Sequence, residues 1–267
     1  MSKILKHSEC AKVALITGTT SGIGFALCEE FAQKKINIIL VSRNHEKLAE
    51  QQEYLQRNFG IKTWIIQQDL ELSDAAHSVY AKVCNLKVNV DYLVHNAGFN
   101  ESGKFIETNI EKEKGMIQLH IMFVTELTKL ILPKMVEQKN GKILFIGSTG
   151  SYVPCALDAV YAATKAYILF FSKAIRAELK GTGITVTTLC PGATQTNFAE
   201  KAGIQGTLLF KLFVLKPKKV ANAGYKSMMR GKVTHIPGIY NKLMVISSRI
   251  FPALLIDYLT MKMLAKK

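Results

Sequence analysis

The sequence predicts one doubly wound α/β domain, with a mostly parallel sheet of about seven strands and helices on both faces. Two observations predict it. Short β-branched runs alternate with longer helical patterns, and runs such as VALIT, NIILVS and KILFIG are apolar on both sides, as a buried parallel sheet requires. The 267 residues contain no Pro-, Gly- or Ser-rich linker and no internal repeat, so we expect a single domain.

Strands and helices alternate in order along the chain. The predicted strands cover residues 13–17, 37–42, 62–67, 92–95, 142–147 and 185–190, with a short last one at 232–236. The predicted helices cover residues 22–34, 45–58, 73–84, 110–137, 161–179 and 218–229. Ligands of such folds bind at the carboxyl ends of the strands, so we expect the functional residues directly after strands.

Basic residues are concentrated in the last quarter of the chain. From residue 201 onward there are thirteen Lys or Arg and one acid, Asp257, so +12 of the net charge of +15 lies there. The excess forms either a solvated basic surface or a contact with something anionic: a membrane face, a CoA- or carrier-linked substrate, or nucleic acid. The region has neither interleaved stacking aromatics nor a recognisable reader motif, so we expect no nucleic-acid binding.

Five cysteines lie far apart, at positions 10, 28, 84, 155 and 190, without a C-x-x-C pair. This pattern favours buried reduced thiols over a metal site or a disulfide framework, and we expect no bound metal. The first twelve residues lack the apolar core of a secretory signal. We therefore expect a cytoplasmic protein.

A glycine-rich loop, TGTTSGIG, directly follows the first strand and opens the first helix. Its spacing suits a dinucleotide, because Gly18 permits a sharp turn, Gly22 a close approach to the pyrophosphate, and Gly24 tight packing of helix on strand. The N-terminus of the helix offers unpaired N–H groups to the phosphates. The expected cofactor-binding residues of the loop are Gly18, Thr20, Ser21, Gly22, Ile23 and Gly24.

Three further motifs follow the third, fourth and sixth strands. They are Asp69-Leu70, Asn96-Ala97-Gly98 and Pro191-Gly192. With the glycine loop they resemble, in the correct order, the motifs of the classical short-chain dehydrogenases/reductases, and the resemblance extends along almost the whole chain. The run PGATQTNFAEKAG looks most like the DltE-type branch. The resemblance implies a Rossmann fold, a nicotinamide cofactor and an oxidoreductase that acts on a carbonyl or alcohol group.

Arg43 indicates which nicotinamide cofactor is used. After the second strand an NAD enzyme carries a carboxylate for the ribose hydroxyls, and here the residues are Ser42, Arg43 and Asn44. An arginine can pair bidentately with a 2′-phosphate, and without the carboxylate that phosphate meets no repulsion. We therefore expect NADP(H) rather than NAD(H).

The pattern Tyr-x-x-x-Lys occurs twice, at Tyr161–Lys165 and Tyr258–Lys262. Only the first opens a helix after the fifth strand with a serine, Ser148, thirteen residues upstream, which is the spacing of the family. On a helix, Lys165 lies on the same face as Tyr161, and its ammonium, with the positive charge of an oxidised nicotinamide, lowers the pKa of the phenol. We expect Tyr161 to donate a proton to the carbonyl oxygen, while Ser148 holds that oxygen.

The resemblance also assigns residues to the cofactor. Lys165 would bind the nicotinamide ribose hydroxyls, and Thr194 would contact the carboxamide. Beyond the glycine loop, the cofactor-binding residues that the resemblance and Arg43 predict are Arg43, Asp69, Leu70, Asn96, Ala97, Gly98, Tyr161, Lys165, Pro191, Gly192 and Thr194.

One position departs from the family. Its active site usually includes an asparagine on the long helix that corresponds to residues 110–137, which helps to hold a water molecule next to the lysine. That place is taken here by His120. The imidazole either continues a proton relay or is a hydrogen-bonded core residue.

The end of the chain is expected to form the substrate side. Residues 194–219 would cap the substrate, and their apolar side chains, Leu208, Leu209, Phe210, Leu212 and Phe213, either face an apolar ligand or form the core of a short helix. The apolar tail at about 240–267 is interrupted by Arg249, Pro252, Asp257 and Lys262, which excludes a spanning helix. It packs against the domain or a second subunit, or lies on a membrane surface.

These observations predict an NADP(H)-dependent oxidoreductase that interconverts a carbonyl and an alcohol on an apolar small molecule, steroid-like, fatty or aromatic. We expect a homo-oligomer, as many relatives form dimers or tetramers, and peripheral membrane contact through the basic C-terminal region. The alternative is a non-catalytic NADP(H)-binding sensor or scaffold that keeps the fold, an interpretation that rests on His120 alone.

Overall fold

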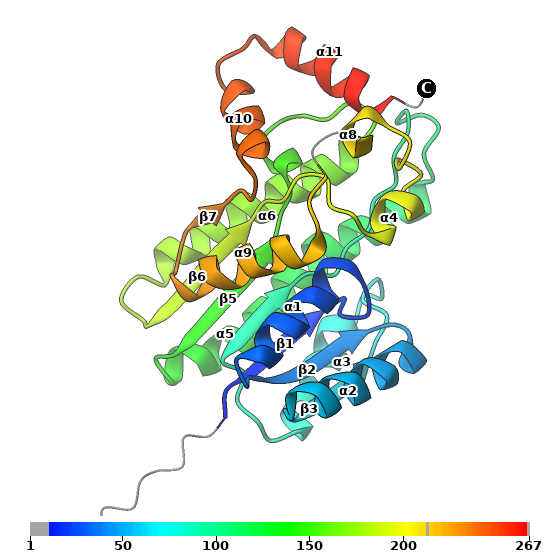
Figure 1. Cartoon of the computed structure of the whole chain (residues 1–267). Coiled ribbons are helices and arrows are strands. Elements are labelled where there is room, and N and C mark those ends of the chain that lie inside the picture. The colour runs from blue at the N-terminus through cyan, green and yellow to red at the C-terminus, as the bar shows by residue number, and fades with distance from the viewer. Residues whose placement is uncertain (1–10, 212–213, 266–267) are drawn as a thin grey trace, which may run out of the picture.

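The computed structural model describes residues 11–211 and 214–265, and its strands form one parallel sheet (Figure 1). The strand order is β3-β2-β1-β4-β5-β6-β7, and every pair of neighbours is parallel. The strands are β1 (Val13–Thr17), β2 (Asn37–Ser42), β3 (Thr63–Gln67), β4 (Tyr92–His95), β5 (Gly141–Ile146), β6 (Ile184–Leu189) and β7 (Thr234–His235). This sheet confirms the predicted fold class.

The strand order reverses between β1 and β4, since β2 and β3 follow β1 to one side and β4 lies on the other. The register places Thr17 of β1 beside Val41 of β2, and Ile16 beside Val94 of β4. The carboxyl ends of the three strands therefore meet at one edge of the sheet. A ligand crevice is expected at such a switch point.

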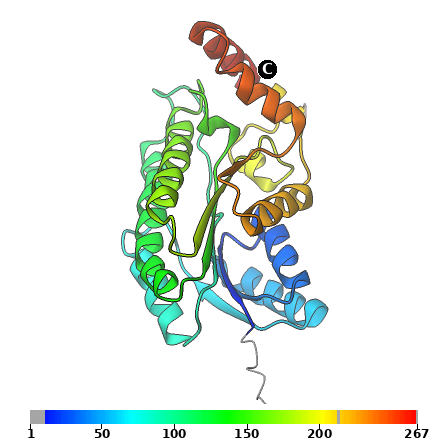
Figure 2. The same ribbon diagram turned by 90° about the vertical axis from the view of Figure 1, so that its left-hand side faces the viewer.

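Helices cover both faces of the sheet, as Figure 2 shows in the view turned by 90°. One face carries α1 (Gly22–Gln33), α2 (His45–Phe59) and α9 (Pro217–Met229). The other carries α3 (Ala75–Asn85), α4 (Ile110–Ile117), α5 (Val124–Glu137) and α6 (Ala159–Glu178). The remaining helices are α7 (Asn197–Lys201), α8 (Leu208–Lys211), α10 (Ile239–Ser247) and α11 (Ala253–Leu264), of which α8, α10 and α11 lie at the upper end in Figure 1.

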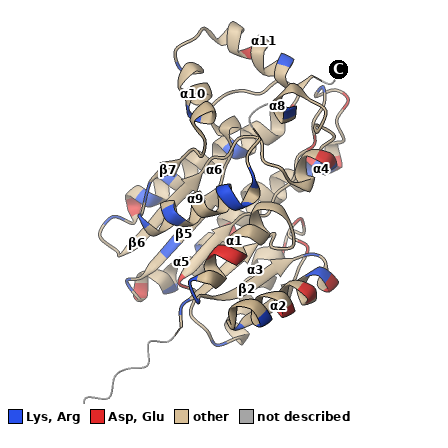
Figure 3. Ribbon diagram, viewed as in Figure 1, with Lys and Arg blue, Asp and Glu red and all other residues tan. Residues whose placement is uncertain are grey.

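The basic excess of the C-terminal region is spread over several elements rather than gathered in one patch (Figure 3). Lys218 and Lys226 lie on α9, and Lys218 pairs with Glu29 of α1 at 3.4 Å. By contrast, α10 and α11 carry few charges, and most of their length is uncharged in Figure 3.

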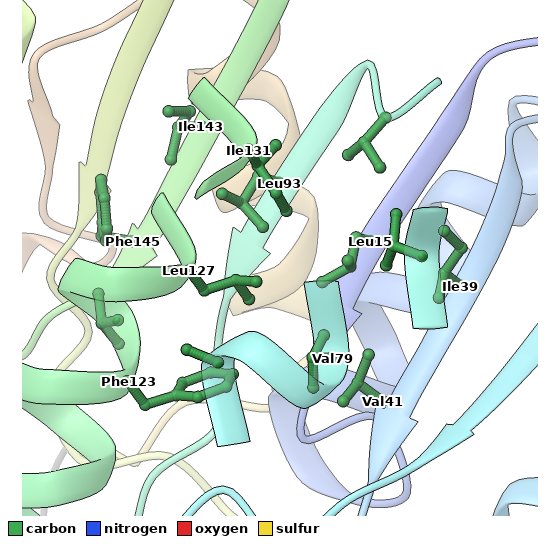
Figure 4. Close-up of a cluster of buried hydrophobic side chains, with 14 of the residues drawn as sticks. Leu15, Ile39, Val41, Val79, Leu93, Phe123, Leu127, Ile131, Ile143 and Phe145 are labelled. Atoms are coloured by element: carbon green, nitrogen blue, oxygen red, sulfur yellow. The ribbon is translucent and has the colours of Figure 1, made fainter. Parts of the chain in front are cut away.

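The core explains why the strands are apolar on both sides. Leu15 and Leu93 point into the layer under α3, α5 and α6, where they meet Phe123, Leu127 and Phe145 (Figure 4). Their neighbours along the same strands, such as Ile16 and Val94, point into the layer under α1, α2 and α9. Alternate residues of each strand are thus buried in different layers.

The predicted helix at 110–137 is interrupted. A π-helical turn, Gln118–Phe123, separates α4 from α5 and contains His120. Among the described residues, Ile110–Glu137 is the one helical run long and apolar enough to cross a membrane by length and composition. Its Leu127 and Ile131 are buried in the core, as in the core helix of a soluble domain.

Three more predictions differ in detail. The third helix begins at Ala75 rather than at 73, and the last strand pairs only Thr234 and His235 with β6. The apolar tail is two helices, α10 and α11, separated at Pro252, which cannot donate a helical hydrogen bond.

Burial of the cysteines follows the prediction only in part. Cys28 and Cys190 are buried, Cys155 is partly buried and Cys84 is exposed. Cys10 lies outside the described residues.

Candidate active site

A cavity of about 590 Å³ lies at the carboxyl ends of the strands. All predicted catalytic and cofactor-binding residues line it, although they come from seven separate segments of the chain. They are Gly18, Thr20, Ser21, Gly22, Ile23, Gly24, Arg43, Asp69, Leu70, Asn96, Ala97, Gly98, Ser148, Tyr161, Lys165, Pro191, Gly192 and Thr194. Their individual roles stay predictions.

The glycine loop has no room for side chains at two positions. Gly18 has a φ of +68°, and a Cβ there would lie 2.8 Å from the Cα atom of Ala97. A Cβ at Gly24 would overlap the carbonyl oxygen of Gly18. The helix α1 then begins beside the cavity, and the side chain of its N-cap residue, Ser21, caps none of its first N–H groups. These donors remain for an anion.

Asn96 fastens the glycine loop to the end of β4. Its Nδ2 atom donates to the carbonyl oxygens of Thr17 and Gly18, at 2.9 and 3.0 Å. In return, the hydroxyl of Thr17 accepts from the backbone N–H groups of Asn96 and Ala97, at 3.0 and 3.1 Å. These bonds fix the distance between β1 and β4 at the switch point of the sheet.

Arg43 lies at the far end of the cavity and is 68% exposed. Its Nη1 atom donates to Oε1 of Glu71 at 3.1 Å and lies 3.6 Å from Oδ2 of Asp69. Sequence reasoning missed Glu71, although it placed Asp69 and Leu70 of the same loop in the site, because spacing does not show which side chains of that loop turn toward Arg43. The two carboxylates hold the guanidinium next to the predicted 2′-phosphate position.

Ser148, Tyr161 and Lys165 meet at the opposite end of the cavity. Ser148 caps a short 3₁₀ helix, since its hydroxyl accepts from the Gly150 N–H at 3.1 Å, and it also lines the cavity. Lys165 is buried, its Nζ atom donates to Ile146 O at 3.0 Å, and it lies 5.6 Å from the centre of the Tyr161 ring.

Burial controls the acid–base properties of this pair. It lowers the pKa of Lys165 to about 8, because the ammonium loses its hydration. The pKa of Tyr161 is raised, because burial disfavours the phenolate and outweighs a hydrogen bond with Ser148 that lowers it. The expected lowering of the Tyr161 pKa by Lys165 together with an oxidised nicotinamide stays a prediction, because these causes concern the protein without that cofactor. Tyr161 keeps its proton at neutral pH.

His120 is a hydrogen-bonded core residue. The Phe99 N–H donates to its Nε2 atom at 3.3 Å, so Nδ1 carries the proton and donates to the Thr164 hydroxyl at 2.9 Å. Thr164 in turn donates to the carbonyl oxygen of Tyr161 at 2.8 Å. Burial, with the charge of Lys165, holds the pKa of His120 well below its ordinary value. Both ring nitrogens are engaged, and the ring braces the helix that carries Tyr161.

A second, much smaller cavity of about 10 Å³ lies behind Lys165 and is lined by His95 and His120 among others. The Nε2 atom of His95 lies 2.9 Å from the Thr128 hydroxyl, whose own hydrogen goes to Val124 O at 2.6 Å. His95 therefore donates through Nε2, and its buried Nδ1 is an acceptor without a hydrogen-bond partner among the described residues. The volume suits one water molecule.

The remaining wall of the large cavity is mostly apolar. Leu209 and Phe210 line it, whereas Leu208 is 40% exposed, and Leu212 and Phe213 lie outside the described residues. Phe210 also packs on the small core of α7, and the contact of this segment with an apolar ligand stays a prediction. Sequence reasoning missed the following apolar lining residues: Val153, Phe198, Ile204, Met244, Met263 and Leu264.

Residues 12–205 match the family model described as short chain dehydrogenase. The match covers most of the chain and includes every predicted site residue. The protein therefore belongs to the short-chain dehydrogenase/reductase family.

Individual relatives agree with this assignment. The chain is 34% identical over 191 residues to a very-long-chain 3-oxoacyl-CoA reductase of Mus musculus, which covers 70% of this chain and 61% of that protein. It is 36% identical over 192 residues to an uncharacterized short-chain type dehydrogenase/reductase of Sinorhizobium fredii, covering 72% and 73%. The chain spans less than two thirds of the length of the matched 3-oxoacyl-CoA reductases of Mus musculus and Danio rerio.

A solved structure has the same fold. The short-chain dehydrogenase from Sphingobium yanoikuyae, in complex with NADPH, superposes with a TM-score of 0.80 at 28% identity. The superposition covers 92% of this chain and 96% of that one.

Proposed function

We propose that the protein is an NADP(H)-dependent oxidoreductase that interconverts a carbonyl and an alcohol on an apolar small molecule. One observation carries the proposal. A single cavity is lined at one end by Arg43 and by the N-terminus of α1, whose free N–H groups suit a phosphate. Ser148, Tyr161 and Lys165 line its other end. Both groups of residues line the same cavity, so one elongated cofactor can reach both.

The residues of the first end fit NADP(H). The N–H groups at the start of α1 suit the pyrophosphate, and the glycines leave space for its close approach. Arg43 suits the 2′-phosphate, and the relative from Sphingobium yanoikuyae, which is described in complex with NADPH, supports this choice. When bound, the cofactor supplies or receives the hydride.

The chain itself supplies the proton. During reduction of a carbonyl, Tyr161, which is protonated at neutral pH, donates its phenolic proton to the carbonyl oxygen. Ser148 donates a second hydrogen bond to the same oxygen. Lys165, anchored on Ile146 O, places its ammonium beside the Tyr161 ring and stabilises the phenolate that remains. In the oxidation direction the proton returns to Tyr161.

The substrate is proposed to be apolar because the wall around the catalytic end is apolar. Phe198 lies 5.8 Å from the Tyr161 ring, and Ile204, Leu209 and Met263 extend the surface. Residues 194–219 act as the substrate cap. The 3-oxoacyl-CoA reductases among the relatives support a fatty carbonyl compound within this class. The alternative of a non-catalytic sensor rested on His120. With His120 in place, the three proposed catalytic residues still line one cavity.

The test is NADPH oxidation by the purified protein with fatty, steroid and aromatic carbonyl compounds. We expect turnover with at least one class, and faster turnover with NADPH than with NADH. Saturable NADPH binding without turnover on the whole panel would overturn the proposal in favour of a sensor or scaffold. The predicted homo-oligomer and the cytoplasmic location are tested separately, by analytical ultracentrifugation and by fractionation of cells.

A further inference from the structure

The outer face of α10, α11 and the turn between them is exposed and apolar. Its side chains include Leu243, Ile246, Ile250, Phe251, Leu254 and Tyr258, with exposed fractions from 51% to 84%. We call these six residues the outer face. Leu243, Ile246 and Ile250 follow the spacing of one side of a helix. Soluble monomers rarely expose an apolar patch of this extent without a partner.

The inner sides of the same helices line the large cavity. Met244 of α10 and Thr260, Met263 and Leu264 of α11 all reach it. In Figures 1 and 2 this pair of helices lies at the end of the molecule, beyond the layers of the sheet. Each helix is therefore a wall with the cavity on one side and the outer face on the other.

The exposed charges on α10, α11 and the turn between them are mostly positive (Figure 3). Lys242, Arg249 and Lys262 are exposed there, against one exposed acid, Asp257 of α11. Arg249 is held at the rim by the ring of Tyr152, at 5.4 Å from its centre. A second copy packed on this face by two-fold symmetry would bring these cations toward their own counterparts. An anionic lipid surface instead complements them.

The lengths of the helices define the mode of contact. The helix α10 has nine residues and α11 has twelve, whereas a spanning helix needs about 20. We propose that the outer face docks on an anionic lipid surface, with its apolar side chains in the headgroup region and Lys242, Arg249 and Lys262 on the lipid phosphates. An apolar substrate then enters the cavity from the lipid side, a route that rests on the proposed function.

Co-sedimentation of the full chain with vesicles tests the docking. We expect binding to vesicles of phosphatidylcholine with phosphatidylglycerol, weaker binding to phosphatidylcholine alone, and release by high salt. The variant Lys242→Gln with Lys262→Gln lowers the affinity roughly fivefold for each cation removed. Ile250→Ser with Leu254→Ser lowers it at least tenfold, since two exposed apolar side chains no longer insert.

Matched controls lie on α6 and directly after it. Phe170 is 71% exposed on α6, and Lys180 is exposed beyond its end, so Phe170→Ser and Lys180→Gln should bind vesicles like the wild type. The docking is overturned by absence of binding at low salt, or by equal losses in the control variants. A stable dimer that dissociates on Leu254→Ser would overturn it too, and would assign the outer face to a second copy.

The same preparations separate docking from catalysis. NADPH turnover on a water-soluble ketone is measured without vesicles. Docking without turnover leaves the lipid contact standing and contradicts the proposed function, whereas turnover without docking contradicts the lipid contact alone. If both hold, vesicle-dissolved ketones should be reduced faster by the wild type than by the Ile250→Ser, Leu254→Ser variant.

Discussion

The guanidinium of Arg43 donates to the carboxylate of Glu71 at 3.1 Å, across the end of the cavity that suits the adenosine part of the cofactor. Asp69 lies slightly farther, at 3.6 Å. Arg43 is thus oriented before any phosphate arrives, but by two groups of the same charge sign as that phosphate. We therefore expect the pair both to orient Arg43 for the 2′-phosphate of NADP(H) and to limit how tightly that phosphate binds.

Replacing Arg43 with aspartate should shift the preference toward NAD(H). The substitution removes the partner of the 2′-phosphate and adds a carboxylate that repels it but accepts from ribose hydroxyls. We expect kcat/KM for NADPH to fall roughly 10- to 100-fold, the value of a charge-assisted hydrogen bond, while that for NADH is kept or rises. Unchanged kinetics with both cofactors would refute the role of Arg43.

Replacing Glu71 with glutamine should tighten NADPH. The amide keeps a hydrogen bond to Arg43 and removes one negative charge that faces the phosphate. We expect a several-fold lower Kd for NADPH and an unchanged Kd for NADH, measured by fluorescence titration. Glu137→Gln, an exposed residue at the end of α5, is the control and should change neither. Equal changes for both cofactors would contradict a specific effect on the 2′-phosphate.

The periodicity of the sequence predicted most of the framework because each strand is a short apolar run between polar loops. The ends of β1, β2 and β4 coincide with the prediction, and those of β5 and β6 differ by one residue. The π-helical turn around His120 was not predictable, since one extra residue in a turn leaves the apolar pattern of the long helix almost unchanged. The sequence indicated an interruption at Pro252, but it did not predict that the tail forms two separate helices.

The site divides in a similar way. Residues that directly follow strands were predicted, because the topology fixes where they meet. Glu71 and His95 contact side chains that come from other loops and helices. Such contacts depend on how the elements pack and not on the spacing of residues in the sequence. The inward side chains Thr260 and Met263 became visible only when α11 was placed against the cavity.

Replacing Gly24 with alanine should damage the cofactor loop, because the new Cβ would overlap the carbonyl oxygen of Gly18. We expect a loss of roughly 1–3 kcal/mol in the free energy of unfolding and weaker NADPH binding. At Gly206 nothing lies within 4 Å of an added Cβ, so Gly206→Ala should change stability by less than about 0.5 kcal/mol. Denaturant unfolding and NADPH titration measure both. An unaffected Gly24→Ala variant would contradict the packing of the loop.

The buried histidines should make the protein less stable in acid. The pKa of His95 is lowered to about 3 by burial, so between pH 6.5 and 3 the unfolded chain binds a proton that the folded one does not. Stability from this residue is complete above pH 6.5 and is lost as the pH falls. Between pH 7 and 5 the loss from His95 is about 2 kcal/mol.

Denaturant unfolding at pH 7 and pH 5 checks this dependence on His95. His95→Phe should show a loss smaller by that amount, whereas His77→Gln, at an exposed position on α3, should keep the dependence of the wild type. The prediction concerns the difference in the free energy of unfolding between the two pH values, so it holds even if His95→Phe changes the stability at pH 7. An identical pH dependence of His95→Phe and the wild type would contradict it.

Tyr161→Phe tests the central claim most directly, because it removes one hydroxyl at the catalytic end of the cavity. NADPH affinity and turnover are measured on the same preparation, with Tyr167→Phe, a residue of the same helix whose hydroxyl contacts Thr125, as the matched control. We predict that Tyr161→Phe binds NADPH like the wild type and loses turnover by at least about 100-fold, while Tyr167→Phe keeps it. Turnover at the wild-type rate in Tyr161→Phe would contradict the proton-donor role and the proposed function with it.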